Sequence, residues 1–145
     1  MWKINIVIMI VAVFLSCKQS VKDSNCSDFK LGTFYYNSKQ SGRSYFITRT
    51  ASIQTERDSF TGATTKAHIN WINDCAYQLD YINETMSNQD TIAEYLKTHS
   101  LKTKILKTKK GEIDGTRYNY CVFETSVFGV NQKLMDTLWK HESSD

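Results

Sequence analysis

Short stretches in which apolar and polar residues alternate are the feature that most constrains how this chain can fold. In residues 44–49, Tyr45 and Ile47 fall on one face, and Phe46 and Thr48 fall on the other. Successive side chains of a β-strand point to opposite faces of its sheet, whereas those of a helix repeat about every 3.6 residues. This period of two predicts strands, and it recurs along most of the chain.

Turn-forming residues divide the chain into about eight such segments. The expected strands are residues 29–36, 44–49, 52–57, 64–71, 75–82, 101–108, 117–125 and 134–140. The last segment also fits a helix, but its alternation favours a strand. Between Ser87 and His99 the period changes, which predicts one short helix capped by Asp90. The expected fold is all-β with this one helix: an antiparallel up-and-down meander that closes into a small barrel or forms a strongly curled sheet.

The pattern also predicts which strand faces are buried. In residues 75–82, one face carries Cys75, Tyr77, Leu79 and Tyr81, and we expect this face to meet the core.

The segment 52–57 is more polar. Ile53 lies on one face, and Gln54 and Glu56 lie on the other, which is typical of a half-exposed hairpin. We expect Arg49 and Glu56 to form a surface ion pair across that hairpin, with a small effect on stability.

The N-terminal residues 1–17 resemble a bacterial lipoprotein signal. Lys3 precedes the apolar run 4–15, which is followed by a small residue and by Cys17. The run is shorter than the roughly 20 apolar residues that a helix needs to cross a bilayer. In such signals the cysteine receives acyl chains that anchor the mature protein. Ordinary signal-peptide cleavage is the alternative, but the large Phe14 stands where that cleavage prefers a small residue.

This signal sets the expected organisation: a signal peptide in residues 1–17, a polar tether in 18–25, and one β-domain in 26–145. The expected location is the bacterial cell envelope, on the periplasmic side or at the cell surface. Removing the signal takes away Lys3 and no acidic residue, so 18 basic residues become 17 against 15 acidic ones, a net charge of +2. A nearly neutral chain without a recognised motif argues against nucleic-acid binding.

Three segments resemble a group of small Bacteroidota lipoproteins, of flavobacterial type, for which no reaction is established. They are the sequence Cys26 to Phe34 with the pattern C-x2-F-K-x-G-x-F, the residues 47–49 with 54–56, and Ile69 to Leu79 with the pattern W-x3-C-x-Y-x-L. The resemblance covers roughly the first half of the mature domain. It implies a fold and an envelope location rather than an activity.

The cysteines fit an exported protein, in which a disulfide can persist. With Cys17 lipidated, we favour a bond between Cys26 and Cys75, because both lie in the segments that carry the resemblance. A bond between Cys75 and Cys121 is the alternative. In the favoured pairing Cys121 is left over and is expected to be a buried apolar side chain rather than a reactive thiol.

Other candidate chemistry is sparse. His68 and His99 are isolated from each other and from any cysteine at metal-ligand spacing, so no metal site is expected. Asp74, Asp80 and Glu84 are explained by turn and strand-edge roles as well as by a carboxylate pair. We therefore assign no catalytic residue and no cofactor.

The densest charge feature is a run of five lysines, which predicts a solvated edge strand that is protected from aggregation. A functional alternative is a patch that contacts anionic lipid headgroups or an acidic partner close to the tether. The run consists of Lys102, Lys104, Lys107, Lys109 and Lys110.

Two function classes remain open. The first is a non-enzymatic envelope lipoprotein that binds a partner protein or, as a second choice, a small apolar ligand. If the meander closes, some of six aromatic residues would line a pocket at the barrel mouth. The second class is a small periplasmic hydrolase or thiol enzyme, which requires a cleft that gathers Cys121, a histidine or the carboxylates. The six aromatic residues are Trp71, Tyr77, Tyr81, Tyr118, Tyr120 and Phe123.

Overall fold

Eight antiparallel strands in sequence order form the predicted meander, and it closes into a barrel, one of the two forms expected. The computed structural model describes residues 25–83, 91–113, 115–127 and 131–141. Cys17, the signal and residues 18–24 of the expected tether lie outside these ranges, as do Glu84 and Asp90. The strands are β1 (Gly32–Asn37), β2 (Ser44–Arg49), β3 (Ile53–Asp58), β4 (Thr64–Asn73), β5 (Ala76–Tyr81), β6 (Leu101–Ile113), β7 (Thr116–Val127) and β8 (Lys133–Lys140). A 3-10 helix, η1 (Cys26–Phe29), precedes them, and the expected short helix is α1 (Thr91–Leu96).

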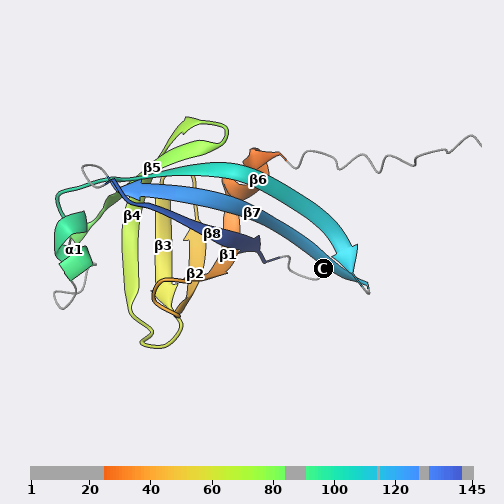
Figure 1. Cartoon of the computed structure of the whole chain (residues 1–145), viewed down its shortest axis with the longest axis horizontal. Coiled ribbons are helices and arrows are strands. Elements are labelled where there is room, and N and C mark those ends of the chain that lie inside the picture. Colours follow the sequence, from red (N-terminus) through yellow and green to blue (C-terminus); the bar gives the residue numbers. More distant parts are fainter. Residues whose placement is uncertain (1–24, 84–90, 114, 128–130, 142–145) are drawn as a thin grey trace, which may run out of the picture.

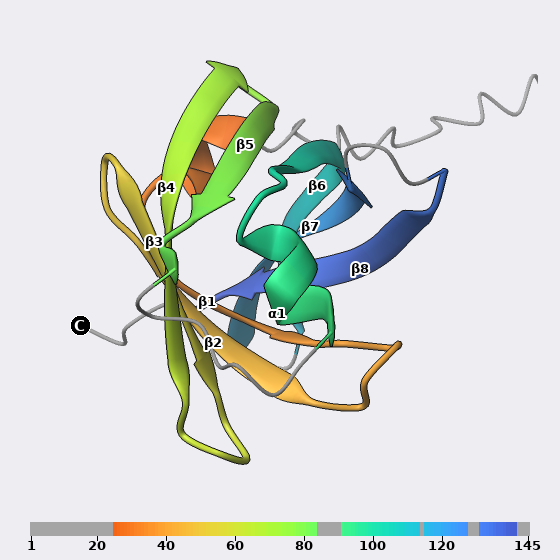
Figure 2. The same cartoon turned by 90° about the vertical axis from the view of Figure 1, so that its left-hand side faces the viewer.

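The two ends of the barrel differ. Strands β1, β3, β5 and β7 end, and β2, β4, β6 and β8 begin, at one end of the barrel, which we call the open end and where α1 also lies (Figure 1). The connections β2–β3 and β4–β5 meet η1 at the other end, which we call the closed end. Figure 2 looks at the molecule from the open end, with α1 in front.

The half of the barrel nearest the closed end is filled by apolar side chains. Phe29 of η1 is fully buried, and its ring stacks on that of Phe34 with 5.8 Å between centroids. Helix η1 therefore plugs this end of the barrel. The buried members of the cluster are Phe29, Phe34, Ile47, Ile105, Cys121 and Leu138.

A second cluster lies between β4 and β5. It joins Ala67 and Ile69 to Tyr77 and Leu79, all of them buried. The inward face predicted for β5 is thus confirmed.

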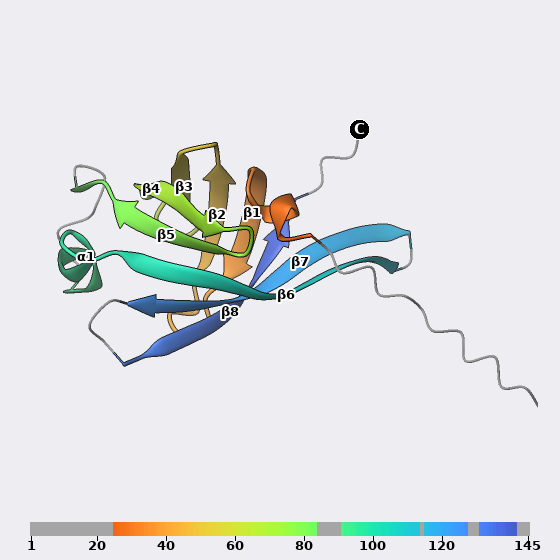
Figure 3. The ribbon, with the colours of Figure 1, turned by 90° about the horizontal axis from the view of Figure 1, so that it is seen from above.

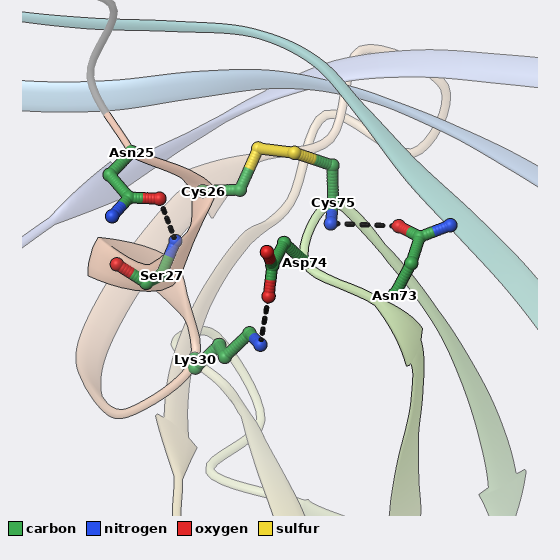
Figure 4. The surroundings of a disulfide bond; sticks show 7 residues. All are labelled: Asn25, Cys26, Ser27, Lys30, Asn73, Asp74 and Cys75. Atoms are coloured by element: carbon green, nitrogen blue, oxygen red, sulfur yellow. Dashed lines mark hydrogen bonds and ion pairs between the residues drawn. A yellow bond between two sulfur atoms is a disulfide. The ribbon is translucent and has the colours of Figure 1, made fainter.

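A disulfide joins Cys26 in η1 to Cys75 in the β4–β5 turn (Figure 4). Beside it, Lys30 and Asp74 form an ion pair with 2.9 Å between Nζ and Oδ1, and the Cys75 amide donates to Asn73 Oδ1. The closed-end plug is therefore fixed to the barrel wall by one covalent and one ionic contact.

Strands β6 and β7 continue beyond the barrel as a hairpin that projects at the closed-end side (Figure 3). β6 pairs with β5 only from Leu101 to Lys104, but it pairs with β7 along its whole length. A register shift between Ile105 and Lys107 marks the point where β6 leaves the barrel wall.

Two predicted boundaries were wrong. The first strand begins at Gly32 and not at residue 29, because the Asn25 side chain accepts a hydrogen bond from the Ser27 amide and caps η1. Gly32 has φ of +120°, a conformation that other residues rarely adopt, and it turns the chain from η1 into β1. The β6–β7 connection is also shorter than predicted, since the strands reach Ile113 and Thr116.

Candidate functional site

The open half of the barrel contains a cavity of about 420 Å³. Eight-stranded barrels have interiors wide enough for side chains alone or for one small ligand, and ligand pockets usually measure about 300–1,000 Å³. The cavity wall combines seven apolar side chains with three tyrosines and several polar groups. The first set is Ile47, Leu79, Leu101, Phe123, Leu134, Met135 and Leu138; the tyrosines are Tyr36, Tyr77 and Tyr81.

The cavity reaches the surface beside the seam that closes the barrel. β1 and β8 pair only through Phe34 with Lys140 and Tyr35 with Trp139. Farther toward the open end, the lining continues through residues 38–40 on one side of the seam and 134–136 on the other. The Lys39 amide donates to Asp136 Oδ2 at 3.3 Å across this gap.

Arg49 forms the polar floor of the cavity. Its side chain is 4 % exposed, and its Nε donates to Gln54 Oε1 at 2.6 Å. Nη1 donates to the carbonyl of Phe29 at 2.8 Å, and Nη2 donates to the Tyr77 hydroxyl at 2.5 Å. The guanidinium carbon also lies 4.5 Å from the centroid of the Tyr77 ring, a cation–π contact. The buried charge is thus held by three hydrogen bonds and an aromatic face, which offset the cost of removing it from water.

Gln54 connects this charge to a carboxyl group. Its Nε2 donates to Glu56 Oε1 at 2.6 Å, and the Tyr81 hydroxyl donates to the same oxygen at 2.9 Å. A chain of hydrogen bonds therefore runs from Arg49 through Gln54 to Glu56 along the inner faces of β2 and β3.

Burial changes the acidity of the groups around Glu56. Loss of water contact raises the pKa of the Glu56 carboxyl, and the bonds from Gln54 and Tyr81 and the charge of Arg49 only partly oppose this. The pKa values of the Tyr36 and Tyr81 hydroxyls are raised by burial and then by the nearby Glu56. Burial likewise raises the pKa of Tyr77, against the effect of Arg49. All three tyrosines remain neutral hydrogen-bonding groups at physiological pH.

The prediction of a surface ion pair between Arg49 and Glu56 was wrong. The register places Arg49 opposite Gln54 and Glu56 opposite Ile47, and both charged side chains point into the barrel. The polar face of β3 points into the barrel, where Gln54 is only 2 % exposed. The β2–β3 hairpin therefore does not turn its polar face to water as the sequence had suggested. The alternation could have indicated that Arg49 points inward, because Arg49 lies two positions after the buried Ile47 and therefore shares its face.

Of the aromatic residues considered for a pocket, the structure brings three to the cavity: Tyr77, Tyr81 and Phe123. The others belong elsewhere, and the sequence did not single out Tyr36, which also lines the cavity. Trp71 packs on Tyr77 at 4.8 Å between centroids. The remaining two, Tyr118 and Tyr120, stack on each other along β7.

Cys121 lies in the apolar cluster with no exposed surface, as expected of a packing residue. Burial raises the pKa of its thiol to about 12, which keeps it protonated. It is therefore unsuited to act as a nucleophile.

His68 lies opposite Asp80 in the β4–β5 register, but the other histidines and carboxylates considered at the sequence level belong to different elements. His68 is exposed on β4, whereas the His99 ring stacks on Tyr95 at 3.7 Å. Lys30 holds the pKa of Asp74 below its usual value, and hydrogen bonds from Ser100, Gln78 and Asn70 do the same for Asp80. Within the described ranges, no three histidine, cysteine or acidic side chains are placed to share a metal ion.

The five lysines of β6 lie on two parts of one strand, and their role as a contact patch stays a prediction. Lys102 and Lys104 are exposed on the barrel wall, where Lys104 is opposite Glu124. Lys107, Lys109 and Lys110 belong to the projecting hairpin.

In the part of the chain that the structure describes, no helix has the length and apolar character needed to cross a bilayer. No family model, no curated protein and no solved structure matches this chain.

Proposed function

We propose that this chain is a non-enzymatic envelope lipoprotein, anchored through Cys17, whose barrel binds a small, partly apolar molecule. The observation that carries the proposal is the cavity of about 420 Å³ at the open end, which has an apolar wall and a fixed polar floor. Ligand sites are usually concave and mostly apolar, with a few placed polar groups.

The rim of the cavity also supports binding of a partly apolar molecule. Leu134 and Met135 line it and are 37 % and 55 % exposed. Exposed apolar side chains beside a cavity are expected where an apolar molecule enters. Binding of a ligand is therefore favoured here over binding of a partner protein.

The alternative of a hydrolase or thiol enzyme loses its main support. That function required an accessible Cys121 close to a histidine or to carboxylates. Cys121 is buried with a raised pKa, and Asp74 and Asp80 have lowered pKa values and are held by their own partners.

Ligand binding can be tested with the lipidated chain reconstituted in nanodiscs and labelled with ¹³C-methyl methionine. The probe is the apolar dye N-phenyl-1-naphthylamine. Because Met135 lines the cavity, its methyl resonance should shift saturably as the dye is added. The Thr125→Trp variant places an indole in the cavity and should abolish the shift. Thr48→Trp, on the exposed outer face of β2, is the matched control and should retain it. The proposal is wrong if the dye leaves the Met135 resonance unmoved in both the native chain and the control.

The anchor requires a separate experiment. Replacing Cys17 with Ala should abolish incorporation of labelled palmitate and release the protein from the membrane fraction. The neighbouring variant Ser20→Ala should behave as the native chain does. An unchanged membrane pellet for Cys17→Ala would contradict the lipoprotein assignment.

A further inference from the structure

In the cavity wall, Glu56 Oε2 and the Tyr36 hydroxyl have no hydrogen-bond partner among the described residues. Both bonds that Glu56 accepts go to Oε1, which leaves its Oε2 unpaired. The Tyr36 hydroxyl also lacks a partner, although its ring is fixed by stacking on Tyr45 and by an edge contact with Phe123. Both residues line the cavity. A bound molecule can therefore satisfy one acceptor and one hydroxyl that the protein leaves open.

The strand register brings these two groups to neighbouring positions around β2. Tyr36 lies opposite Tyr45, and Glu56 lies opposite Ile47, two residues farther along the same face of β2. Among the charged groups near Tyr36, Glu56 has the largest effect on its hydroxyl, and Glu56 and Tyr36 both act on Tyr81. The Tyr81 hydroxyl is bonded to Glu56, so it positions the carboxyl rather than offering itself to a ligand. The open acceptor and the open hydroxyl thus form one polar site at the cavity wall.

The positive charge in the cavity is already engaged. Arg49 donates from all three of its nitrogen atoms to Gln54, to the Phe29 carbonyl and to Tyr77. Its charge is therefore used to hold the barrel floor and the plug, and it is a poor receptor for an anionic ligand.

The other charges of the lining also favour a neutral ligand. Lys39 and Arg49 are balanced by Glu56 and Asp136, so the wall has no excess of either sign. Burying an ion in such a cavity costs more than burying an uncharged group that makes the same hydrogen bonds.

We propose that the cavity selects an uncharged ligand group that both donates and accepts a hydrogen bond, such as a primary amide or a hydroxyl, held between Glu56 and Tyr36. The group donates to Glu56 Oε2 and accepts from the Tyr36 hydroxyl, while the apolar part of the ligand lies against Leu79 and Phe123. This assignment rests on the proposed function, since it presupposes that the cavity binds a ligand.

The test uses three probes with one skeleton: 3-phenylpropanamide, 3-phenylpropanoate and 3-phenylpropylammonium. Their affinities are measured at pH 7.5 from the Met135 methyl shift of the chain in nanodiscs. The amide both donates and accepts, whereas the anion can only accept and the cation can only donate. We expect the native chain to bind the amide about tenfold more tightly than either ion, the factor that one unsatisfied buried hydrogen-bonding group produces.

Two variants separate recognition from a structural role. Tyr36→Phe removes only the hydroxyl and should weaken binding of the amide about fivefold to tenfold. Glu56→Gln removes the charge and supplies an N–H donor, so the preference should shift toward 3-phenylpropanoate by about tenfold or more. The matched controls are Tyr35→Phe and Glu112→Gln, because Tyr35 and Glu112 are exposed and do not line the cavity. Both controls should keep the native order of affinities.

The dye N-phenyl-1-naphthylamine separates this inference from the proposed function. If the dye still shifts Met135 but the native chain binds an ion as tightly as the amide, the inference is overturned and ligand binding stands. It is also overturned if Glu56→Gln leaves the ratio of amide to propanoate affinity unchanged. If neither the dye nor any probe shifts Met135, the proposed function itself fails.

Discussion

Removing the disulfide should weaken the whole fold by an amount that follows from its place in the chain. Cys26 and Cys75 are separated by 49 positions. In the chain-entropy model, closing a loop of this size lowers the entropy of the unfolded chain by an amount that corresponds to about 4 kcal/mol at 25 °C. The double variant Cys26→Ala/Cys75→Ala should therefore lose about 4 kcal/mol of its free energy of unfolding.

The native contacts of the plug do not depend on the bond itself. In the variant we expect Phe29 to stay packed on Phe34 and its carbonyl to keep the hydrogen bond from Arg49 Nη1, both of which the native structure contains. Small domains are stable by about 5–15 kcal/mol, so the variant should still fold under native conditions. Most of the loss is then an effect on the unfolded chain.

Urea unfolding followed by tryptophan fluorescence measures this difference, since Trp71 on β4 and Trp139 on β8 are partly buried in the folded barrel and become solvated when it unfolds. Dithiothreitol should reduce the stability of the native chain to that of the double variant and should leave the variant unchanged. A loss below about 1 kcal/mol, or an equal effect of the reductant on both proteins, would refute the reasoning.

Three further outcomes are expected. Because burial raises the pKa of Glu56, ionisation of this carboxyl costs the folded native chain stability as the pH rises from the ordinary glutamate range through the raised value. Glu56→Gln lacks this loss, so its advantage in urea unfolding should be larger at pH 8 than at pH 4; an equal difference at both would contradict the assignment. The Cys121 thiol, with a pKa of about 12, should resist Ellman's reagent in the native chain and react as one thiol per chain in urea without reductant. Rapid labelling of the folded chain would show that it is accessible. Phe29→Ala should cost about 3–5 kcal/mol in the same assay, whereas Phe60→Ala, at a ring that is 85 % exposed, should cost little; similar losses would argue against the plug.

The architecture was predictable because its determinants are local. The alternation in residues 44–49 and 75–82 predicted both strands and, for the second, the inner face, and short turns between neighbouring segments imply a meander. The core position of Tyr77 and Leu79 followed from the same pattern.

The cavity could not be predicted in the same way. On β3 the choice of inner face depends on the strands around it, and Gln54 and Glu56 are turned inward because Arg49 and Tyr81 satisfy them there. The seam that encloses the cavity joins Phe34 to Lys140, residues far apart in the sequence with no local signal for their pairing. Polar residues in a strand are usually read as solvent-facing, and only the closed barrel shows that these are not.

A closed barrel has no strand edges, but the projecting hairpin creates one again. Beyond Ile105, β6 pairs with β7 and with no other described strand, so its outer backbone groups form a template to which a strand of a second molecule can add. Lys107, Lys109 and Lys110 place three positive charges along this edge. Two copies that approach edge to edge therefore repel each other, and salt weakens that repulsion. The lysines that first suggested a contact surface thus also oppose fibre-like self-assembly. The repulsion between two such edges is strongest at low ionic strength.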